Sequence, residues 1–590
     1  MINQEIAKIF YEIAEYLAMD DVPFKPQAYE KAALSLESLS DDVVDIYKKE
    51  GLKGLGDISG IGQGMAEKIK EYIKSGKIKE YEKMKKKMPV DLQELSRVEG
   101  LGPKRIKILY RKLKIKNLKD LERAALVHEI EKIEGFGEKI EKNILDGLNF
   151  LKTVSGRFIL GHVSPQINDI VDRLKKIKEV DQIEVAGSVR RKKETIGDAD
   201  ILITSKNPKK VMDFFVSLPD VADVLAHGQT KSVIRLKNGL PAGRQGLEVD
   251  LRVVKPESFG AALQYFTGNK EHNIKLRKIA QDKGYKLNEY GLFKKEKLIA
   301  GKTEAEIYEK LGMTYIAPEM REDMGEIELS KKAFVGEAKM PNLINYEDLR
   351  GDLQMHTGWT DGENSIEEMS NKAIEMGLEY IVVTDHTKSL AMTGGLDENK
   401  LLNQMIEIDK LNSSFKLQAS SFKILKGAEV NILKDGYLDI DDEVLSKLDV
   451  VGAAVHSNFN LSKKEQTERI KKAMQNKNVD IIFHPTGRVI NKRSAYDLDI
   501  DEIIKIAKET GTILEIDAFP DRLDLKDDYI RKAIKAGVKL SIDSDAHDVK
   551  HLKYLGLGVS QARRGWAEKK DIINAWPLEE MLKMLKSGIM

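Results

Sequence analysis

Short apolar runs, most of them ending in a histidine or an acidic residue, alternate with helical stretches from residue 346 to the end of the chain. This alternation predicts a parallel β-sheet, either open or closed into a barrel. In such folds the carboxyl ends of the strands carry the chemistry, so the side chains that end these runs should meet at one place. The runs are YIVVTDH, KILKGAEVNI, VVGAAVHS, VDIIFHP, TILEIDA and VKLSIDSDAH.

The side chains at these strand ends are of types that bind metal ions. One histidine at a strand end is usually structural, but five histidines with three acids in equivalent places predict a multi-metal phosphoesterase. The chain contains no cysteine, so the ligands suit Zn²⁺, Mn²⁺ or Fe²⁺ rather than a cysteine-bound structural zinc. The candidate ligands are His356, Asp361, His386, Glu429, His456, His484, Asp545 and His547.

The formal net charge of +1 conceals an uneven distribution. Residues 351–590 hold 34 Lys and Arg against 40 Asp and Glu, whereas residues 60–120 hold 18 against 8. A basic segment of this kind favours nucleic-acid binding in the first part of the chain. The N-terminus is amphipathic and no long apolar run occurs, so we expect neither a signal peptide nor a membrane span. We expect a cytoplasmic monomer or weak oligomer.

Three Gly-apolar-Gly breaks interrupt the helical pattern of residues 1–150, at ISGIGQG, VEGLGPK and IEGFGEK. Each precedes a helix, where glycine permits positive φ and lets a phosphate approach backbone N–H groups. This helix-hairpin-helix pattern predicts sequence-independent DNA binding through Gly60, Gly62, Gly100, Gly102 and the nearby Lys104. A single copy would equally well be a plain helix end. The third copy carries Glu138 and is expected to be structural.

A second set of carboxylates lies in residues 155–325, where short strands mix with helices to give an α+β domain. Asp198 and Asp200 share one face of a strand, and Asp250 lies on the strand that follows the loop KNGLPAGRQG, read as a hairpin. Three such carboxylates hold two divalent cations ~3.5–4 Å apart for phosphoryl transfer. The turn at Gly187 and Ser188 precedes them and points towards phosphate binding.

The motif GS-x-RR, followed by GD-x-D, a D-x-R strand and YFTG, resembles the nucleotidyltransferase palm of family X DNA polymerases. The resemblance implies Mg²⁺ or Mn²⁺ bound by Asp198, Asp200 and Asp250, with Asp250 helping to activate the primer hydroxyl. It also implies roles in binding the nucleotide and the template. These fall to Gly187, Ser188 and Arg191 for the triphosphate, Tyr265, Phe266 and Gly268 for the sugar, Asn273 for the base and Arg277 for the template.

The segments FKPQAYEKAA and GIGQGMAEKIKEYIKSGK resemble the lyase domain of the same family. By position Lys68 matches its Schiff-base lysine, Tyr29 a tyrosine of the pocket and Lys25 a phosphate contact. Cationic neighbours are expected to lower the pKa of Lys68. Glu80 and Gly64 stand where the family has basic residues, and a solvated lysine is the competing interpretation.

Residues 346–590 resemble a PHP domain, a distorted (β/α)₇ barrel with a trinuclear metal centre. By analogy one of two to three ions takes His356, Glu429 and Asp545, a second takes Glu429, His456 and His484, and a third takes Asp361, His386 and His547. Gln354 replaces the first histidine of the H-x-H motif, so the first ion should bind weakly. Arg488 of HPTGR is expected to contact phosphate.

The resemblance covers almost the whole chain. It implies a gap-filling polymerase of base excision repair acting on gapped or nicked DNA with deoxynucleoside triphosphates. It also implies a 3′–5′ exonuclease that extends to abasic-site endonuclease and 3′-phosphatase activity. A nuclease or phosphatase whose palm only holds DNA, or a nucleotidyltransferase for another substrate, are the alternatives. The expected domains are lyase-like (1–85), helix-hairpin-helix fingers (86–152), palm (153–260), thumb-like (261–325), linker (326–345) and PHP (346–590).

Overall fold

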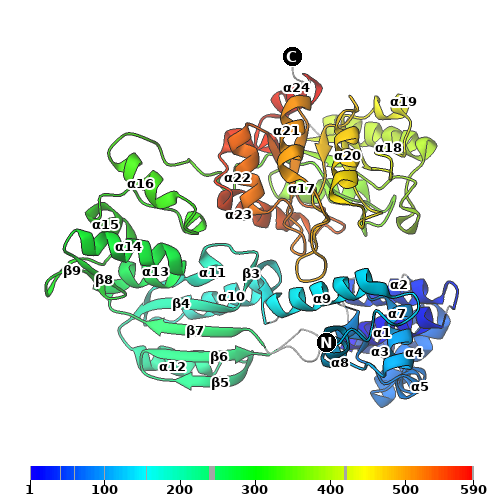
Figure 1. Cartoon of the computed structure of the whole chain (residues 1–590), viewed down its shortest axis with the longest axis horizontal. Coiled ribbons are helices and arrows are strands. Elements are labelled where there is room, and N and C mark those ends of the chain that lie inside the picture. The colour runs from blue at the N-terminus through cyan, green and yellow to red at the C-terminus, as the bar shows by residue number, and fades with distance from the viewer. Residues whose placement is uncertain are drawn as a thin grey trace. The chain divides into compact units, whose positions relative to one another are not determined.

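The structure is a computed structural model that describes the chain except residues 1, 21, 40–41, 59, 97, 99, 155, 238–245, 418–421 and 588–590. Most of the expected hairpin loop KNGLPAGRQG lies outside the described residues. The chain divides into a helical unit that ends at Gly156 and an α/β unit that begins at Arg157 (Figure 1). No helix among the described residues is long and apolar enough to cross a membrane.

The helical unit buries one face of each amphipathic helix in a shared core built around Phe10, Leu36 and Phe136. Its longest contact is between α1 and α2, which pack along each other. The helices are α1 (Ile2–Met19), α2 (Lys25–Ser38), α3 (Val43–Gly56), α4 (Gln63–Ser75), α5 (Lys79–Lys87), α6 (Leu92–Leu95), α7 (Pro103–Leu113), α8 (Leu118–Leu126) and α9 (Gly137–Val154).

The three glycine hairpins begin with the same backbone geometry, but only two of them keep it at the second glycine. The first glycine of each has positive φ, at 77°, 78° and 87° for Gly60, Gly100 and Gly135. The apolar residue between the glycines is buried in every copy. Gly62 and Gly102 are extended N-caps of α4 and α7, whereas Gly137 has a φ of 48° inside α9. The third hairpin therefore departs from the other two.

The palm is a mixed five-stranded sheet in the order β2-β4-β7-β6-β5. Its strands β2 (Val180–Val185), β4 (Asp198–Ser205), β6 (Lys231–Leu236) and β7 (Glu248–Val253) match the expected strands, while β5 (Val221–His227) was missed because its side chains are mostly exposed. The elements that frame the sheet are β1 (Phe158–Ile159), α10 (Leu160–Lys175), α11 (Gly187–Arg190), β3 (Thr195–Ile196) and α12 (Pro208–Val216).

The thumb-like part packs helices against a small antiparallel sheet, β10-β9-β8, that the sequence did not predict. Helix α16 (Glu326–Phe334) lies within the expected linker, yet Ile327 and Leu343 join the thumb core. The other elements are α13 (Phe259–Thr267), α14 (Lys270–Asp282), β8 (Lys286–Asn288), β9 (Gly291–Lys294), β10 (Lys297–Ala300) and α15 (Glu304–Lys310).

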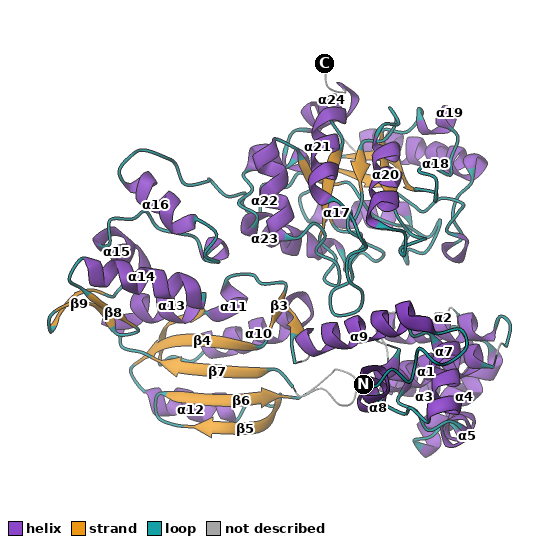
Figure 2. Ribbon diagram, viewed as in Figure 1, coloured by secondary structure: helices purple, strands orange, loops and turns teal. Residues whose placement is uncertain are grey.

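The C-terminal domain is a nearly closed barrel of seven parallel strands in sequential order, β11 to β17. Helices surround its strands (Figure 2), and Met355 bridges to Ala546 beside the seam between β11 and β17. The strands are β11 (Gly351–Asp352), β12 (Tyr380–Val383), β13 (Lys423–Asn431), β14 (Val450–Ala454), β15 (Ile481–Ile482), β16 (Ile513–Asp517) and β17 (Leu540–Asp543). The helices are α17 (Ile366–Glu375), α18 (Glu398–Leu417), α19 (Asp442–Leu445), α20 (Lys463–Met474), α21 (Ile500–Thr510), α22 (Asp527–Ala536), α23 (Leu555–Arg564) and α24 (Leu578–Ser587).

The palm and the barrel pack against each other within the α/β unit. Ile159 of the palm shares an apolar cluster with Ile490 and Leu523 of the barrel. Gly161 lies so close to the barrel that a Cβ there would approach Leu557 to 2.7 Å. The two domains therefore meet at side-chain contact distance, where close packing leaves no room for an added methyl group.

Candidate functional site

The palm carboxylates are brought together by the parallel register of two strands. Asp200 on β4 lies directly opposite Asp250 on β7, and Asp198 stands two residues before Asp200 on the same face. Burial, with Asp198 and Asp250 nearby, raises the pKa of Asp200 to about 7. Gly187 must lack a side chain because a Cβ there would lie 2.5 Å from an Asp200 carboxylate oxygen.

Two basic side chains, Arg252 and Lys231, bind the Asp250 carboxylate, and neither was among the residues predicted for the site. Its Oδ2 accepts from Arg252 at 2.9 Å and lies 3.1 Å from the Lys231 ammonium. Its Oδ1 is buried without a hydrogen-bond partner. Such an orphaned oxygen beside two further carboxylates fits a divalent cation. Arg252 could have been found from the sequence, because it lies two residues from Asp250 on the same face of β7.

The residues expected to contact the sugar, base and template lie on α13 and α14 or between them, and the Arg252 guanidinium lies 4.5 Å from the centre of the Phe266 ring. Tyr265 and Phe266 pack edge to face on α13, with ring centroids 5.2 Å apart. The amide of Asn273 is occupied, since it donates to the Tyr265 carbonyl and accepts from Gln264. Arg277 donates to the Asn273 carbonyl at 3.3 Å. In this structure Asn273 shapes the YFTG turn, and its expected contact with a base stays a prediction.

Arg191 is held by the thumb. Its Nε donates to Glu322 at 3.0 Å and its Nη1 to the carbonyl of Thr267. The preceding Arg190 makes a bidentate pair with Glu304 at 2.9 and 2.7 Å. Both arginines of the GS-x-RR motif are thus anchored outside the palm, a feature that sequence proximity does not reveal.

The barrel brings its histidines and acids to one end around Glu429. The Glu429 carboxylate lies 2.7 Å from His484 Nε2, 3.0 Å from His386 Nδ1, 3.1 Å from His456 Nε2 and 3.3 Å from His356 Nε2. These residues come from the ends of different strands, as the alternating pattern predicted. Two groupings have the spacing of metal ligands: His356 with Asp361, His386 and His547, and His386 with Glu429 and His456.

The histidines and acids of this cluster shift each other's pKa values. Burial by itself would lower the pKa of His356, but Asp545, Glu429 and Asp361 raise it to about 10. Burial would raise the pKa of Glu429, but His386 and His456 hold it well below its usual range. Both ring nitrogens of His356 and one Glu429 oxygen are buried without hydrogen-bond partners. These donor atoms fit divalent cations that would replace the protons.

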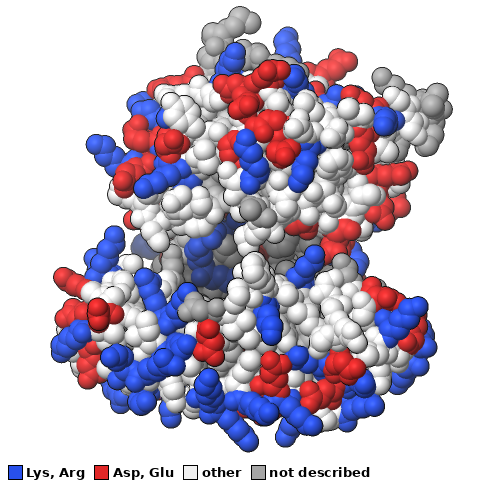
Figure 3. Space-filling model, turned by 90° about the vertical axis from the view of Figure 1, so that its right-hand side faces the viewer, with Lys and Arg blue, Asp and Glu red and all other residues white. Residues whose placement is uncertain are grey.

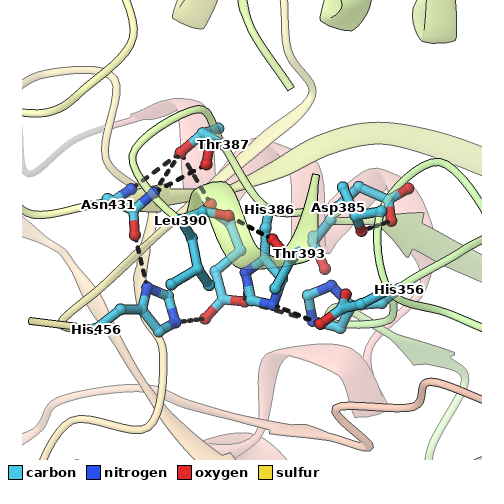
Figure 4. A network of polar contacts seen from close by, with 12 residues as sticks. His356, Asp385, His386, Thr387, Leu390, Thr393, Asn431 and His456 are labelled. Atoms are coloured by element: carbon cyan, nitrogen blue, oxygen red, sulfur yellow. Dashed lines mark hydrogen bonds and ion pairs between the residues drawn. The ribbon is translucent and has the colours of Figure 1, made fainter. Parts of the chain in front are cut away.

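Neighbouring groups orient the ring nitrogens. Asn431 Oδ1 lies 2.8 Å from His456 Nδ1, which leaves Nε2 directed at Glu429 (Figure 4). The carbonyl of Asp545 accepts from His547 Nδ1 in the same way. Asn431 is held in turn by Thr387 and Asp439. No pattern in the sequence points to these supporting residues.

Gln354 and Arg488 each make hydrogen bonds within the protein that the sequence did not predict. Gln354 is fully buried, and with its amide nitrogen oriented towards Glu515 it donates to that carboxylate. Arg488 is bound to Glu194 of the palm at 2.8 Å and to the carbonyl of Leu523. In this structure Arg488 therefore joins two domains, and its contact with phosphate stays a prediction. Arg522 lies nearer the ligands, 3.4 Å from Asp545.

The lyase-like pocket corrects one expectation. Lys68 lies 3.0 Å from Glu80 of α5 and near the ring of the buried Tyr29. Burial would lower the pKa of Lys68, but hydrogen bonds to Tyr29 and Glu80 raise it above its ordinary value. The expected lowering by cationic neighbours is therefore wrong, because the hydrogen bonds to Tyr29 and Glu80 outweigh burial and favour the charged amine. Lys25 begins α2 and is exposed.

Comparison with known proteins matches four segments to described families. Residues 1–78 match a helix-hairpin-helix domain, 92–149 a SAM-like helix-hairpin-helix tandem, 262–322 the DNA polymerase beta thumb and 352–519 the PHP domain. The DNA polymerase/3′-5′ exonuclease PolX of Bacillus subtilis is 37% identical over 99% of this chain and 100% of its own length.

The chain belongs to the family X DNA polymerases that carry a C-terminal PHP domain. The resemblance drawn from GS-x-RR, GD-x-D and YFTG is thereby confirmed, as are the multidomain fold and the barrel. DNA polymerase lambda of Rattus norvegicus is 27% identical over 45% of this chain and 48% of its own. A probable phosphatase of Thermoanaerobacter sp. is 32% identical over 31% of this chain and 73% of its own.

Proposed function

We propose that this family X polymerase fills short gaps in duplex DNA at the palm and trims 3′ ends at the PHP barrel, as a monomer in base excision repair. Deoxynucleoside triphosphates and gapped or nicked DNA are its substrates. The observation that carries the proposal is the presence of two separate sets of converging side chains, a carboxylate set in the palm and a set of histidines and acids in the barrel. Two phosphoryl-transfer sites on one chain suit opposite reactions on one DNA end.

At the palm, Asp198, Asp200 and Asp250 would hold Mg²⁺ or Mn²⁺, which supplies positive charge to the transferred phosphoryl group. Lys231 and Arg252 fix one oxygen of Asp250 and leave the other directed at the site. Ser188 and Arg191 would bind the triphosphate, and Tyr265, Phe266 and Gly268 the sugar. The raised pKa of Asp200 makes cation binding release a proton below about pH 7.

At the barrel, the histidines and acids around Glu429 would hold Zn²⁺, Mn²⁺ or Fe²⁺, which supplies Lewis acidity for attack of water on phosphorus. Asn431 keeps His456 in the tautomer that presents Nε2, and Glu429 spans the group. Gln354 contributes no imidazole, so the ion nearest His356 and Asp545 binds most weakly. The likeness to probable phosphatases favours removal of 3′ phosphates at the same site.

The helix-hairpin-helix segments would bind the DNA backbone. In the lower part of the view in Figure 3, Lys and Arg side chains gather along the lower edge, with Asp and Glu side chains between them. Gly62, Gly102 and Lys104 lie at the starts of α4 and α7, where backbone N–H groups are available to phosphate oxygens. The contacts carry no sequence information, as suits a repair enzyme.

The test is a labelled one-nucleotide gap with Mn²⁺, with and without nucleotides, followed for extension and shortening in one gel. Asp250→Ala should abolish extension and keep shortening, while His484→Ala should do the reverse. Asp223→Ala on the edge strand β5 is the control and should change neither. Loss of both activities in either variant, with the fold intact, would contradict two independent sites. Absence of extension in the unaltered protein would favour a palm that only holds DNA.

A further inference from the structure

A buried group of charges joins Arg191, which follows α11 of the palm, to helix α23 of the PHP domain. The Glu322 carboxylate accepts a hydrogen bond from Arg191 of the palm at 3.0 Å and another from Arg564 of α23 at 3.1 Å. Arg564 also donates to the main-chain carbonyl of Arg191 at 2.7 Å and to Asp527. The side chain and the backbone of Arg191 are thus both held, the latter by a residue of the other catalytic domain.

Burial makes these contacts restrictive. The Arg564 side chain is 2% exposed, and those of Arg191 and Glu322 are each 13% exposed. A charged pair in such surroundings has few alternative partners, and removing one member leaves the other buried and uncompensated. Lys193 also approaches Glu322, at 3.5 Å. Arg191, Lys193 and Arg564 therefore share the Glu322 carboxylate. Because Arg564 also pairs with Glu322, it weakens the attraction of Glu322 for Arg191.

The remaining donor of Arg191 has a natural use. Nε and Nη1 are occupied by Glu322 and Thr267, and Nη2 has no hydrogen-bond partner among the described residues. An arginine fixed on two sides presents its last N–H groups in a set direction, which suits a phosphate oxygen. The orientation depends on the backbone at Arg191, and Arg564 holds that backbone.

We propose that Arg564 is a positioning residue for nucleotide binding, so that the PHP domain completes the triphosphate site of the polymerase. This rests on the proposed function, in which Arg191 contacts the triphosphate of the incoming nucleotide. Arg564 touches neither nucleotide nor DNA and acts through the carbonyl of Arg191 and through Glu322. Its loss should weaken nucleotide binding rather than slow the chemical step.

The neighbouring arginine offers a matched control. Arg563 also lies on α23 and also pairs with the thumb, at 2.8 Å from Glu319, with a further hydrogen bond to the carbonyl of Ile344. Among the residues that the structure describes, no hydrogen bond joins Arg563 to Arg191. If α23 served only to hold the domains together, Arg563→Gln and Arg564→Gln would have the same consequence.

The experiment measures extension of a one-nucleotide gap by the full-length protein against nucleotide concentration, giving kcat and KM separately. Arg564→Gln should raise the nucleotide KM at least about five-fold with kcat within two-fold, Arg564→Lys should raise it less, and Arg563→Gln should leave it within two-fold. Glu322→Gln should also raise KM, and the double variant with Arg564→Gln should rise by less than the product of the two.

Hydrolysis of the p-nitrophenyl ester of thymidine 5′-phosphate, together with circular dichroism, reports whether each variant is folded. An unchanged KM in Arg564→Gln, or an equal rise in Arg563→Gln, overturns the proposal. Should Arg564→Gln fail to fold, Arg564→Lys decides in the same way. If the unaltered protein does not extend the gap at all, the proposed polymerase function fails, which is a different result from an unchanged KM.

Discussion

Asp200 is a carboxylate that the fold holds where its ionised form is unfavourable. Burial and two neighbouring acids raise its pKa to about 7. That Asp198 and Asp200 share a face was predictable from strand alternation, because residues two apart on a strand point to the same side. The raised pKa was not predictable, because it depends on burial within the folded palm and on Asp250 of the neighbouring strand β7.

Because of this raised pKa, the stability of the metal-free palm should depend on pH. A carboxyl group whose pKa is raised in the folded state stabilises the fold below its unfolded pKa and loses that contribution as pH rises through about 7. Without divalent ions, β4 and β7 should exchange amide hydrogens faster at pH 8 than at pH 6, after correction for intrinsic rates. Asp200→Asn should remove most of the difference, and Asp223→Asn should not. A difference that persists in Asp200→Asn would contradict this assignment.

Lys68 shows how one neighbour on another helix reverses an expectation. Glu80 lies twelve residues away on α5, yet it pairs with Lys68 and favours the protonated amine, which is not a nucleophile. Glu80→Gln should therefore increase borohydride trapping of the protein on abasic-site DNA, several-fold at pH 7.5. Lys68→Ala in the same background should abolish the gain. Equal trapping with and without Glu80 would show that this pair does not limit the amine.

At the scale of elements, the glycine hairpins couple backbone conformation to DNA binding. Gly100→Ala forces a side chain into a φ of 78°, at a cost of roughly 1 kcal/mol, and disturbs the start of α7. DNA affinity should fall at all sequences alike. Gly76→Ala is the matched control, since Gly76 has a φ of 68° but ends α4 outside the hairpins. Fluorescence anisotropy on a gapped duplex measures both, and equal losses would assign the effect to strain alone.

Elements with strong periodicity were predictable from the sequence, and elements without it were not. The barrel strands are apolar and end in polar ligands, so both their existence and their shared end followed from the pattern. Strand β5 was missed because nearly all its side chains are exposed, and the β8–β10 sheet because its strands have three or four residues each. The partnership of Arg191, Glu322 and Arg564 joins positions far apart in the chain, which local patterns cannot reveal.

At the scale of the molecule, Arg488 and Glu194 form a half-buried ion pair between palm and barrel. Arg488→Met should destabilise the α/β unit by about 3 kcal/mol, because Glu194 is left without its partner. Arg488→Met combined with Glu194→Met should cost less than the single change. Denaturant unfolding followed by tryptophan fluorescence reports it, since Trp359, Trp566 and Trp576 all lie in the barrel. Additive losses would show that the two side chains do not interact.

The apolar contact between Ile159 and the barrel limits which truncations and domain exchanges such a chain can tolerate. A truncation before the barrel would expose Ile159 and remove the barrel surface that Gly161 closely approaches. A barrel exchanged from a relative would have to reproduce the same shape at Leu557. Synthesis and trimming are therefore tied to one gene by a surface that takes part in neither reaction, and recombination between family members should succeed only when both sides of that surface travel together.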